Sequence, residues 1–331
     1  MLKSSSIKFI VYTLYVICLI VGLYNHEMWR DEYDWFLQAR DTANFFDLGK
    51  TMSPGHGMIW RSCLWLINRF SENPVSMKVF HGFIAAGFAY ILLFKSPFKV
   101  WQSAILLAGY FLLFEYAVIS RCYAFGVLFL FLFASNYSRF LQLTWSGGIL
   151  LLLLSNTSIY ALMITSVLTA WLFFNQIFND KQDWWTNTLK QLPVFLLIGA
   201  GILISSFQII PHPENSFPIH LVTYPIDDYR LREAITQFFS AFVPICRFQH
   251  NYFWNTNFAM NLQGLVHWFW VLVLFIFVSV PFIRKSSILL LWLSGVLLIL
   301  FFQYYTGFRY ARYYGHFFLL WLTCCWLMTL Y

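Results

Sequence analysis

The chain of 331 residues has few charged side chains, because Asp, Glu, Lys and Arg make up only 11% of it. An average soluble domain has roughly 25%. The six cysteines form no Cys-x-x-Cys pair, and the chain has no Gly-rich phosphate loop and no internal repeat. This pattern predicts neither a disulfide framework nor a zinc site. The basic residues behind the net charge of +7 are scattered singly, so we predict no nucleic-acid binding.

Hydrophobic residues make up 60% of the chain and aromatic residues 22%, which is typical of a polytopic membrane protein. We predict an all-α fold, a transmembrane helical bundle of about ten spans forming a single domain over residues 1–331. The first span lacks a small-x-small cleavage site and is predicted to be a retained signal-anchor. The predicted spans are 7–24, 77–94, 100–116, 122–138, 145–156, 158–175, 191–210, 264–283, 286–304 and 315–331.

The lysines and arginines of the short loops indicate a cytoplasmic N-terminus. Two long loops, 25–76 and 211–263, are then extracytoplasmic, and both are predicted to contain interfacial helices. As an alternative, residues 54–70 could cross the membrane, but Arg61 would then lie mid-span. A charge at the bilayer centre costs at least ~2.5 kcal/mol. An amphipathic helix at the interface therefore fits this segment better.

Two pairs of acids begin segments of the extracytoplasmic loops. Asp31 and Glu32 follow the first apolar run directly, where carboxylates can act as general bases or bind cations. The other interpretation of this pair is a solvated loop that only needs polarity. Asp227 and Asp228 are predicted to begin a helix, in which Phe238 and Phe239 can face the membrane.

Four polar groups lie on one membrane face in this topology. They are Asp31 with Glu32, the stretch 115–121, Asp227 with Asp228, and Arg309 with Arg312. Arginine suits phosphate because its planar guanidinium donates two parallel hydrogen bonds. Carboxylates and arginines at one mouth of a bundle suggest an anionic, lipid-borne substrate.

Three short motifs occur in order along the first part of the chain. They are Trp29-Arg-Asp-Glu32, the segments Ser53-Pro-Gly-His56 and 74–78, and Arg121-Cys-Tyr-Ala124. With them, the chain resembles the integral-membrane GT-C glycosyltransferases, such as protein O-mannosyltransferases and the lipid A aminoarabinose transferase. It is most similar to the bacterial branch that uses polyprenyl-phosphate sugars. The resemblance covers about the first 175 residues well and the rest weakly.

The resemblance implies a function for each candidate residue. Asp31 would be the catalytic base or hold a divalent cation, with Glu32 as its helper, and Arg309 or Arg312 would stabilise the departing phosphate. The remaining candidates for substrate contacts are His56, Arg121, Tyr123, Asp227 and Asp228. Asp31 and Glu115 are the possible ligands of Mg²⁺ or Mn²⁺, a cofactor that the sequence leaves open.

The implied reaction moves a sugar from a polyprenyl-phosphate donor to a lipid, glycan or protein acceptor. It would take place in a multi-pass protein of the cytoplasmic (inner) membrane, among membrane lipids on the extracytoplasmic side. The chain departs from the family at Ile119 and Ser120, where relatives often have an acid, and at Ile159, where they often have a histidine. Because of these departures, the sequence does not decide whether the site has a second catalytic acid or a metal ion.

Two other classes of protein remain as alternatives. An O-antigen-polymerase-like or flippase-like protein would share the arginines, but it would not need the acids after the first helix. A secondary transporter would show a repeat between halves and charges near the midplane. Nearly every charge of this chain maps instead to the end of a predicted span.

Overall fold

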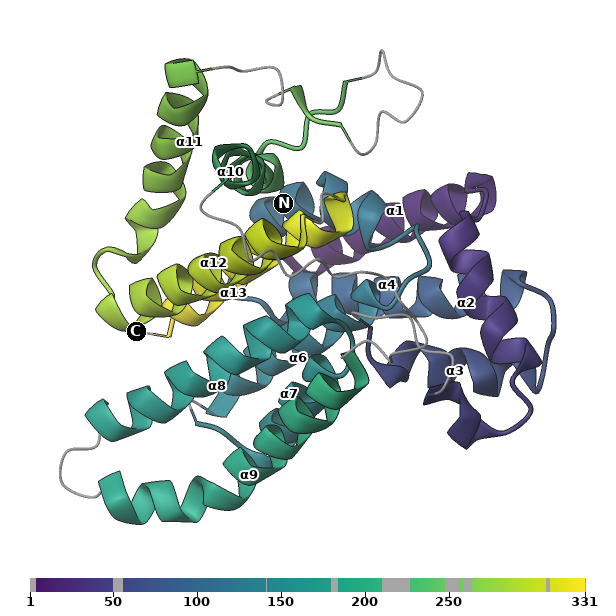
Figure 1. The fold of residues 1–331 in the computed structure, drawn as a ribbon, viewed down its shortest axis with the longest axis horizontal. Coiled ribbons are helices and arrows are strands. Elements are labelled where there is room, and N and C mark those ends of the chain that lie inside the picture. The colour runs from purple at the N-terminus through teal and green to yellow at the C-terminus, as the bar shows by residue number, and fades with distance from the viewer. Residues whose placement is uncertain are drawn as a thin grey trace. The chain divides into compact units, whose positions relative to one another are not determined.

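The computed structural model describes residues 4–49, 56–140, 142–179, 184–209, 227–247, 256–258, 264–307 and 310–330. Within these residues the secondary structure is helical, apart from an isolated bridge between His56 and Ser158 (Figure 1). The prediction of an all-α fold is confirmed. The chain divides into two compact units, Met1–Phe217 and Pro218–Tyr331. The single domain over residues 1–331 stays a prediction.

Unit 1 begins with a long apolar helix and the helices of the first loop. These are α1 (Ser4–Asn25), α2 (Arg30–Asp41), the 3₁₀ helix η1 (Phe45–Gly49) and α3 (Met58–Asn68). The rest of the unit contains α4 (Val75–Lys95), α5 (Val100–Ala108), the π-helix η2 (Phe111–Glu115), α6 (Tyr123–Phe140), α7 (Trp145–Ser155), α8 (Ile159–Asn179) and α9 (Trp184–Ile209). Unit 2 contains α10 (Asp228–Phe242), α11 (Gly264–Ser279), the 3₁₀ helix η5 (Val280–Phe282), α12 (Ser286–Thr306) and α13 (Ala311–Met328).

Five helices of the described residues are long and apolar enough to cross a membrane, as expected of a multi-pass membrane protein. Their apolar stretches are Ser5–Asn25, Val75–Lys95, Ile159–Gln176, Thr188–Ile209 and Ser286–Thr306. The prediction of about ten spans is therefore corrected. The other predicted spans coincide with helices that are too short or too polar, because crossing the hydrocarbon core takes about 20 apolar residues.

The remaining predicted spans correspond to helices that do not meet the length or polarity needed to cross a membrane. Helix α5 has 9 residues and ends at Gly109, before the separate π-helix η2. Helices α7 and α11 have 11 and 16 residues. Helices α6 and α13 reach 18 residues, but the last turn of α6 contains Arg139 and the first turn of α13 contains Arg312. Hydropathy along the sequence registered the apolar runs but not where their helices stop.

Helix α6 forms the centre of unit 1, where it packs against α4 and α7. Its Phe131 and Phe133 are fully buried. Helices α7 and α9 also pack closely, because a Cβ atom built on Gly148 would lie 2.5 Å from Val194 and one on Gly201 would lie 2.8 Å from Leu152. A larger side chain at either glycine would force these helices apart.

The amphipathic segment of the first loop is helix α3, whose 11 residues are too few to cross a bilayer. Its Arg61 is only 1% exposed and is surrounded by protein groups. The guanidinium donates to the carbonyl of Leu48 and to Oε1 of Gln38, and it lies 4.4 Å from the ring centre of Trp35. Burial lowers the pKa of Arg61 to about 10. Arg61 thus joins α3 to α2 and η1.

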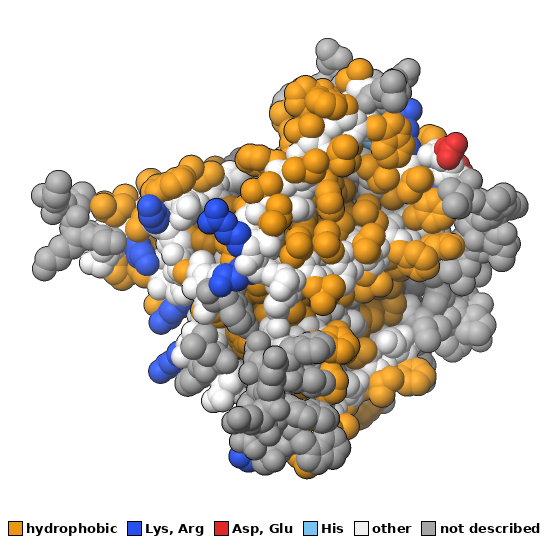
Figure 2. All heavy atoms as spheres, turned by 90° about the vertical axis from the view of Figure 1, so that its left-hand side faces the viewer, with side chains coloured by type: hydrophobic (Ala, Val, Ile, Leu, Met, Phe, Trp, Pro, Cys, Tyr) orange, Lys and Arg blue, Asp and Glu red, His pale blue; other side chains and the backbone are white. Residues whose placement is uncertain are grey.

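Unit 2 is built around α10, which packs against α11, α12 and α13. Phe238 is 2% exposed, and its ring contacts Phe275, Trp292 and Phe317. The expectation that Phe238 and Phe239 face the membrane is wrong, because both side chains are buried where α10 packs against neighbouring helices. On the face drawn in Figure 2, apolar side chains predominate among the described residues.

Candidate functional site

The acidic pair lies in the first turn of α2, where carboxylates interact favourably with the helix dipole. Trp29 is the N-cap residue, and its backbone N–H donates to Oε2 of Glu32 at 2.8 Å. This contact is one half of a capping box, in which the third residue of the helix reaches back to the cap. Because successive helical residues are about 100° apart, Asp31 and Glu32 point in different directions.

Glu32 points inward and is completely buried. Its Oε1 accepts the backbone N–H of Ser120 at 2.6 Å, and its Oε2 lies 2.7 Å from Nε2 of His26. Burial raises the pKa of Glu32, but the hydrogen bond and charge of His26 and the N–H groups of Trp29 and Ser120 outweigh it. The pKa therefore lies below its ordinary value. Glu32 is thus an ionised structural acid whose two oxygens already accept hydrogen bonds.

Asp31 points to a more open position, with 43% of its side chain exposed. Its Oδ2 accepts a hydrogen bond of 2.7 Å from Nη1 of Arg121, whose side chain is only 5% exposed. The structure thus brings together two of the predicted site residues across 90 positions of sequence. A buried guanidinium holds a carboxylate that an approaching molecule can still reach.

Arg121 belongs to the buried turn 116–122, which connects the π-helix η2 to α6. The backbone N–H of Tyr116 bonds to Phe111, and that of Val118 bonds to Phe114, so the turn continues the coil of η2. Tyr123, the first residue of α6, is 2% exposed. Its ring contacts those of His56 and Tyr116, and its predicted contact with substrate stays a prediction.

His56 is also near this group, although it is 8% exposed and therefore buried. Its ring packs edge-on against Trp35 at 5.0 Å and against Tyr123 at 5.8 Å. Its Nδ1 lies 3.5 Å from Sγ of Cys122. The following residue, Gly57, has no room for a side chain, because a Cβ there would lie 1.9 Å from the carbonyl oxygen of Asn156. This contact fixes the approach of the segment to the turn between α7 and α8.

Glu115, the second possible metal ligand, ends the π-helix η2 and is 4% exposed. It accepts a hydrogen bond of 2.8 Å from the hydroxyl of Tyr110. No group of three or more His, Cys, Asp or Glu side chains suited to a metal ion occurs in the described part of the chain. Asp31 and Glu115 thus do not belong to such a group, and the divalent cation stays a prediction.

The side chain of Asp227 has its partners within α10, whereas its backbone N–H donates to the hydroxyl of Tyr304 in α12 at 2.8 Å. Asp227 caps α10 by accepting the backbone N–H of Tyr229 at 2.9 Å, and it lies 3.5 Å from Arg230. Asp228 lies exposed in the first turn of the same helix. These contacts confirm the predicted helix start.

Arg312 is 7% exposed and lies over the rings of Tyr310 and Tyr313, at 4.3 and 5.2 Å. Arg309 lies outside the described residues. A common site of these arginines with Asp31 stays a prediction.

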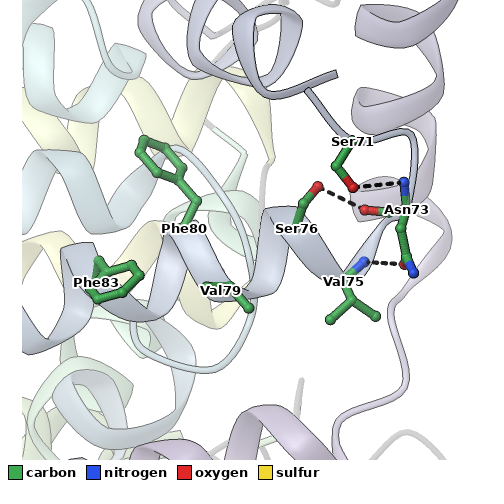
Figure 3. A pocket seen from close by; sticks show the side chains of 7 residues that line it. All are labelled: Ser71, Asn73, Val75, Ser76, Val79, Phe80 and Phe83. Atoms are coloured by element: carbon green, nitrogen blue, oxygen red, sulfur yellow. Dashed lines mark hydrogen bonds between the residues drawn. The ribbon is translucent and has the colours of Figure 1, made fainter. Parts of the chain in front are cut away.

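A pocket of about 420 Å³ lies elsewhere, at the start of α4 (Figure 3). Its polar end pairs internally, because Oδ1 of Asn73 accepts the N–H of Val75 and the hydroxyl of Ser76 donates to the carbonyl of Asn73. Its apolar end includes the largely exposed Phe83. None of the predicted site residues lines it, so we place the candidate site at Asp31 and Arg121 on the geometry of that pair.

Sequence reasoning missed the groups that hold the acids in place. These are His26 and the backbone N–H of Ser120, which both contact Glu32. A histidine shortly before the acids was a visible signal for His26. A backbone N–H carries no side-chain signal, so the contact of Ser120 with Glu32 could not be found from the sequence.

Comparison with known proteins adds no further constraint. No protein-family model, no curated protein and no solved structure matches the chain.

Proposed function

We propose that this protein is a membrane glycosyltransferase of the GT-C type. It would transfer a sugar from a polyprenyl-phosphate donor to a lipid, glycan or protein acceptor at the extracytoplasmic face of the cytoplasmic membrane. The observation that carries the proposal is the hydrogen bond between buried Arg121 and half-exposed Asp31, which shortly follows the first apolar helix. The apolar helices long enough to span a membrane support the location.

The proposed chemistry gives Asp31 the function of general base. Its carboxylate takes the proton of an acceptor hydroxyl, and the hydroxyl oxygen forms a bond to the anomeric carbon of the sugar. The bond between that carbon and the phosphate oxygen breaks, and the lipid phosphate leaves with the electron pair. Arg121 orients the carboxylate through the 2.7 Å hydrogen bond. A well-placed general base typically accelerates a reaction about 10²–10⁴-fold.

Arg309 and Arg312 would bind the donor phosphate in this proposal. Fixed cationic donors stabilise charge that develops on a leaving group. Replacing Arg312 with Lys would keep the charge but lose the planar fork, so we expect a raised apparent KM for the donor. Replacement with Ala would cost more, about 1.5–3 kcal/mol for a charged hydrogen bond. An unchanged KM in both variants would remove Arg312 from the donor site.

The orientation in the membrane has its own test. With the N-terminus in the cytoplasm, the 3₁₀ helix η1 lies outside and the loop between α4 and α5 lies inside. A membrane-impermeant thiol reagent applied to intact cells should then label Asp47→Cys and spare Pro97→Cys. The reverse pattern would put Asp31 on the cytoplasmic side and contradict the proposal.

The activity test uses purified protein with a panel of radiolabelled polyprenyl-phosphate sugars and membrane-lipid, glycan and peptide acceptors. Parallel reactions with EDTA test whether a divalent cation is needed. We expect transfer from at least one donor, and loss of that transfer in Asp31→Asn. The absence of transfer from every donor would favour a polymerase-like, flippase-like or transporter function instead.

A further inference from the structure

The buried carboxylate of Glu32 connects segments that are far apart in the sequence. One oxygen accepts the backbone N–H of Ser120 from the turn 116–122. The other accepts the N–H of Trp29 and meets the ring of His26, from the segment between α1 and α2. We refer to His26, Glu32 and the N–H of Ser120 as the latch. All of its side chains are at least nine-tenths buried.

The latch is also tied to α4. Nζ of Lys78 donates to the carbonyl oxygens of Leu23 and His26, at the end of α1 and just beyond it. On the next turn of α4, the side chain of His81 is fully buried. The end of α1, the start of α2, the turn 116–122 and α4 thus meet around one carboxylate.

The latch lies directly beside the proposed reacting pair. Glu32 follows Asp31 on α2, and Ser120 precedes Arg121 on the turn. Two bridges therefore run side by side between the same two segments, one from Glu32 to Ser120 and one from Asp31 to Arg121. The first is buried completely, whereas the second has an exposed carboxylate. The buried bridge is the one that solvent cannot compete for.

We propose that His26 and Glu32 are positioning residues, which hold α2 on the turn 116–122 and thereby align Asp31 with Arg121. The sequence resemblance had suggested Glu32 as a catalytic helper. The geometry assigns it a different function, because its oxygens already accept hydrogen bonds from the protein. The consequence for catalysis rests on the proposed function, whereas the structural consequence does not.

Cys122 reports the state of the latch, because it follows Arg121 on the same turn and is only 3% exposed. The purified protein is treated with N-ethylmaleimide, and the labelling of each cysteine is followed by mass spectrometry. We expect Cys122 to react about 10–100-fold faster in Glu32→Ala and His26→Ala, because charged hydrogen bonds are lost. His26→Gln should restore much of the protection, since its amide can still donate to Glu32.

Two matched variants and two internal cysteines control the measurement. Ser120→Ala should label like the wild type, because the latch uses the backbone N–H and the buried hydroxyl has no hydrogen-bond partner among the described residues. Asp34→Asn removes an exposed acid of α2 and should also have no effect. Cys324 is fully buried in unit 2 and reports global unfolding, and partly exposed Cys246, which lies outside the apolar helices, reports reagent activity.

The outcomes separate the inference from the proposed function. Two results would contradict the structural function of the latch. In the first, Cys122 is labelled at the wild-type rate in both Ala variants. In the second, Cys324 becomes labelled in parallel with Cys122 in all Glu32 and His26 variants. With an active wild type, we expect kcat to fall in His26→Ala with little change in KM, and to recover in His26→Gln. Unchanged kcat despite exposed Cys122 would overturn the positioning function. A wild type without transferase activity would defeat the proposed function, while the labelling would still decide the latch.

Discussion

Helices α2 and α10 begin alike, each with two acids in or beside the first turn, but the two pairs do different things. At α10, Asp227 caps its own helix and lies near Arg230, three residues away. At α2, Asp31 and Glu32 bond to residues 90 and 88 positions further along the chain. The same sequence pattern thus produces a local helix cap in one place and a long-range connection in the other.

Burial accounts for the difference. The partners of the Asp227 side chain are near in sequence and partly exposed, so water competes with them. Arg121 and Ser120 lie in a turn whose residues are all buried, so each needs a partner supplied by the fold. Two acids at the start of a helix therefore indicate a functional site only when the segment that packs against them is known.

The largest effect that separates the two helices should come from Asp31→Asn. Asn is nearly isosteric but cannot take a proton, so we expect sugar transfer to fall about 10²–10⁴-fold. The rate of transfer from the preferred donor is measured, with Asp34→Asn on the same helix as the control. Retention of more than roughly a third of the activity would make Asp31 an ordinary acid of the loop.

The next effect compares the two arginine partners. Arg121→Ala should destabilise the protein by about 1–3 kcal/mol, because it removes a buried charge-assisted hydrogen bond to a carboxylate that water can partly solvate. Arg230→Ala should cost less than about 0.5 kcal/mol, as is usual for exposed pairs. Chemical denaturation in detergent measures both. Equal losses would contradict the distinction between a buried and a local partner.

A smaller effect is expected at the cap of α10. Asp227→Ala removes the acceptor for the N–H of Tyr229 and should cost about 1 kcal/mol. Asp227→Asn keeps a hydrogen-bond acceptor at the cap, so the loss of stability should be only a few tenths of the loss in Asp227→Ala. Both losses should appear as shifts of the thermal midpoint. A large effect of Asp227→Asn on donor use would instead support its predicted contact with substrate.

The smallest effect should appear on acidification. The pKa of Glu32 is lower in the folded protein than its ordinary value of 4.5, so the folded state binds this proton less readily than the unfolded state. The stability that Glu32 contributes is present above pH 4.5 and is lost as the pH falls through the lower folded value. Denaturation midpoints of wild type and Glu32→Gln, measured from pH 7 downward, should therefore converge. Parallel curves would contradict an ionised Glu32.

Sequence reasoning succeeded where the controlling interactions are local. Helix α3 and the start of α10 at Asp227 follow from amphipathic spacing and from N-capping, which act within a few residues. It failed at the spans, because the apolar run 100–116 continues past the break that ends α5 at Gly109. The turn after α7 at Ser155, in contrast, was predicted from its polar residues. Hydropathy averages over such breaks, and whether a buried helix crosses the bilayer depends on its length.

The sequence by itself determined that this is an all-α chain with membrane-length apolar helices, because composition and periodicity act along the chain. It also indicated Asp31, Glu32 and Arg121 as residues of interest. Only the tertiary structure decided that Asp31 is reachable, that Glu32 is enclosed with His26, and that Arg121 faces Asp31. These facts depend on which distant segments exclude water from a carboxylate. Water exclusion is a property of the packed molecule, so no neighbouring residue in the sequence reveals it.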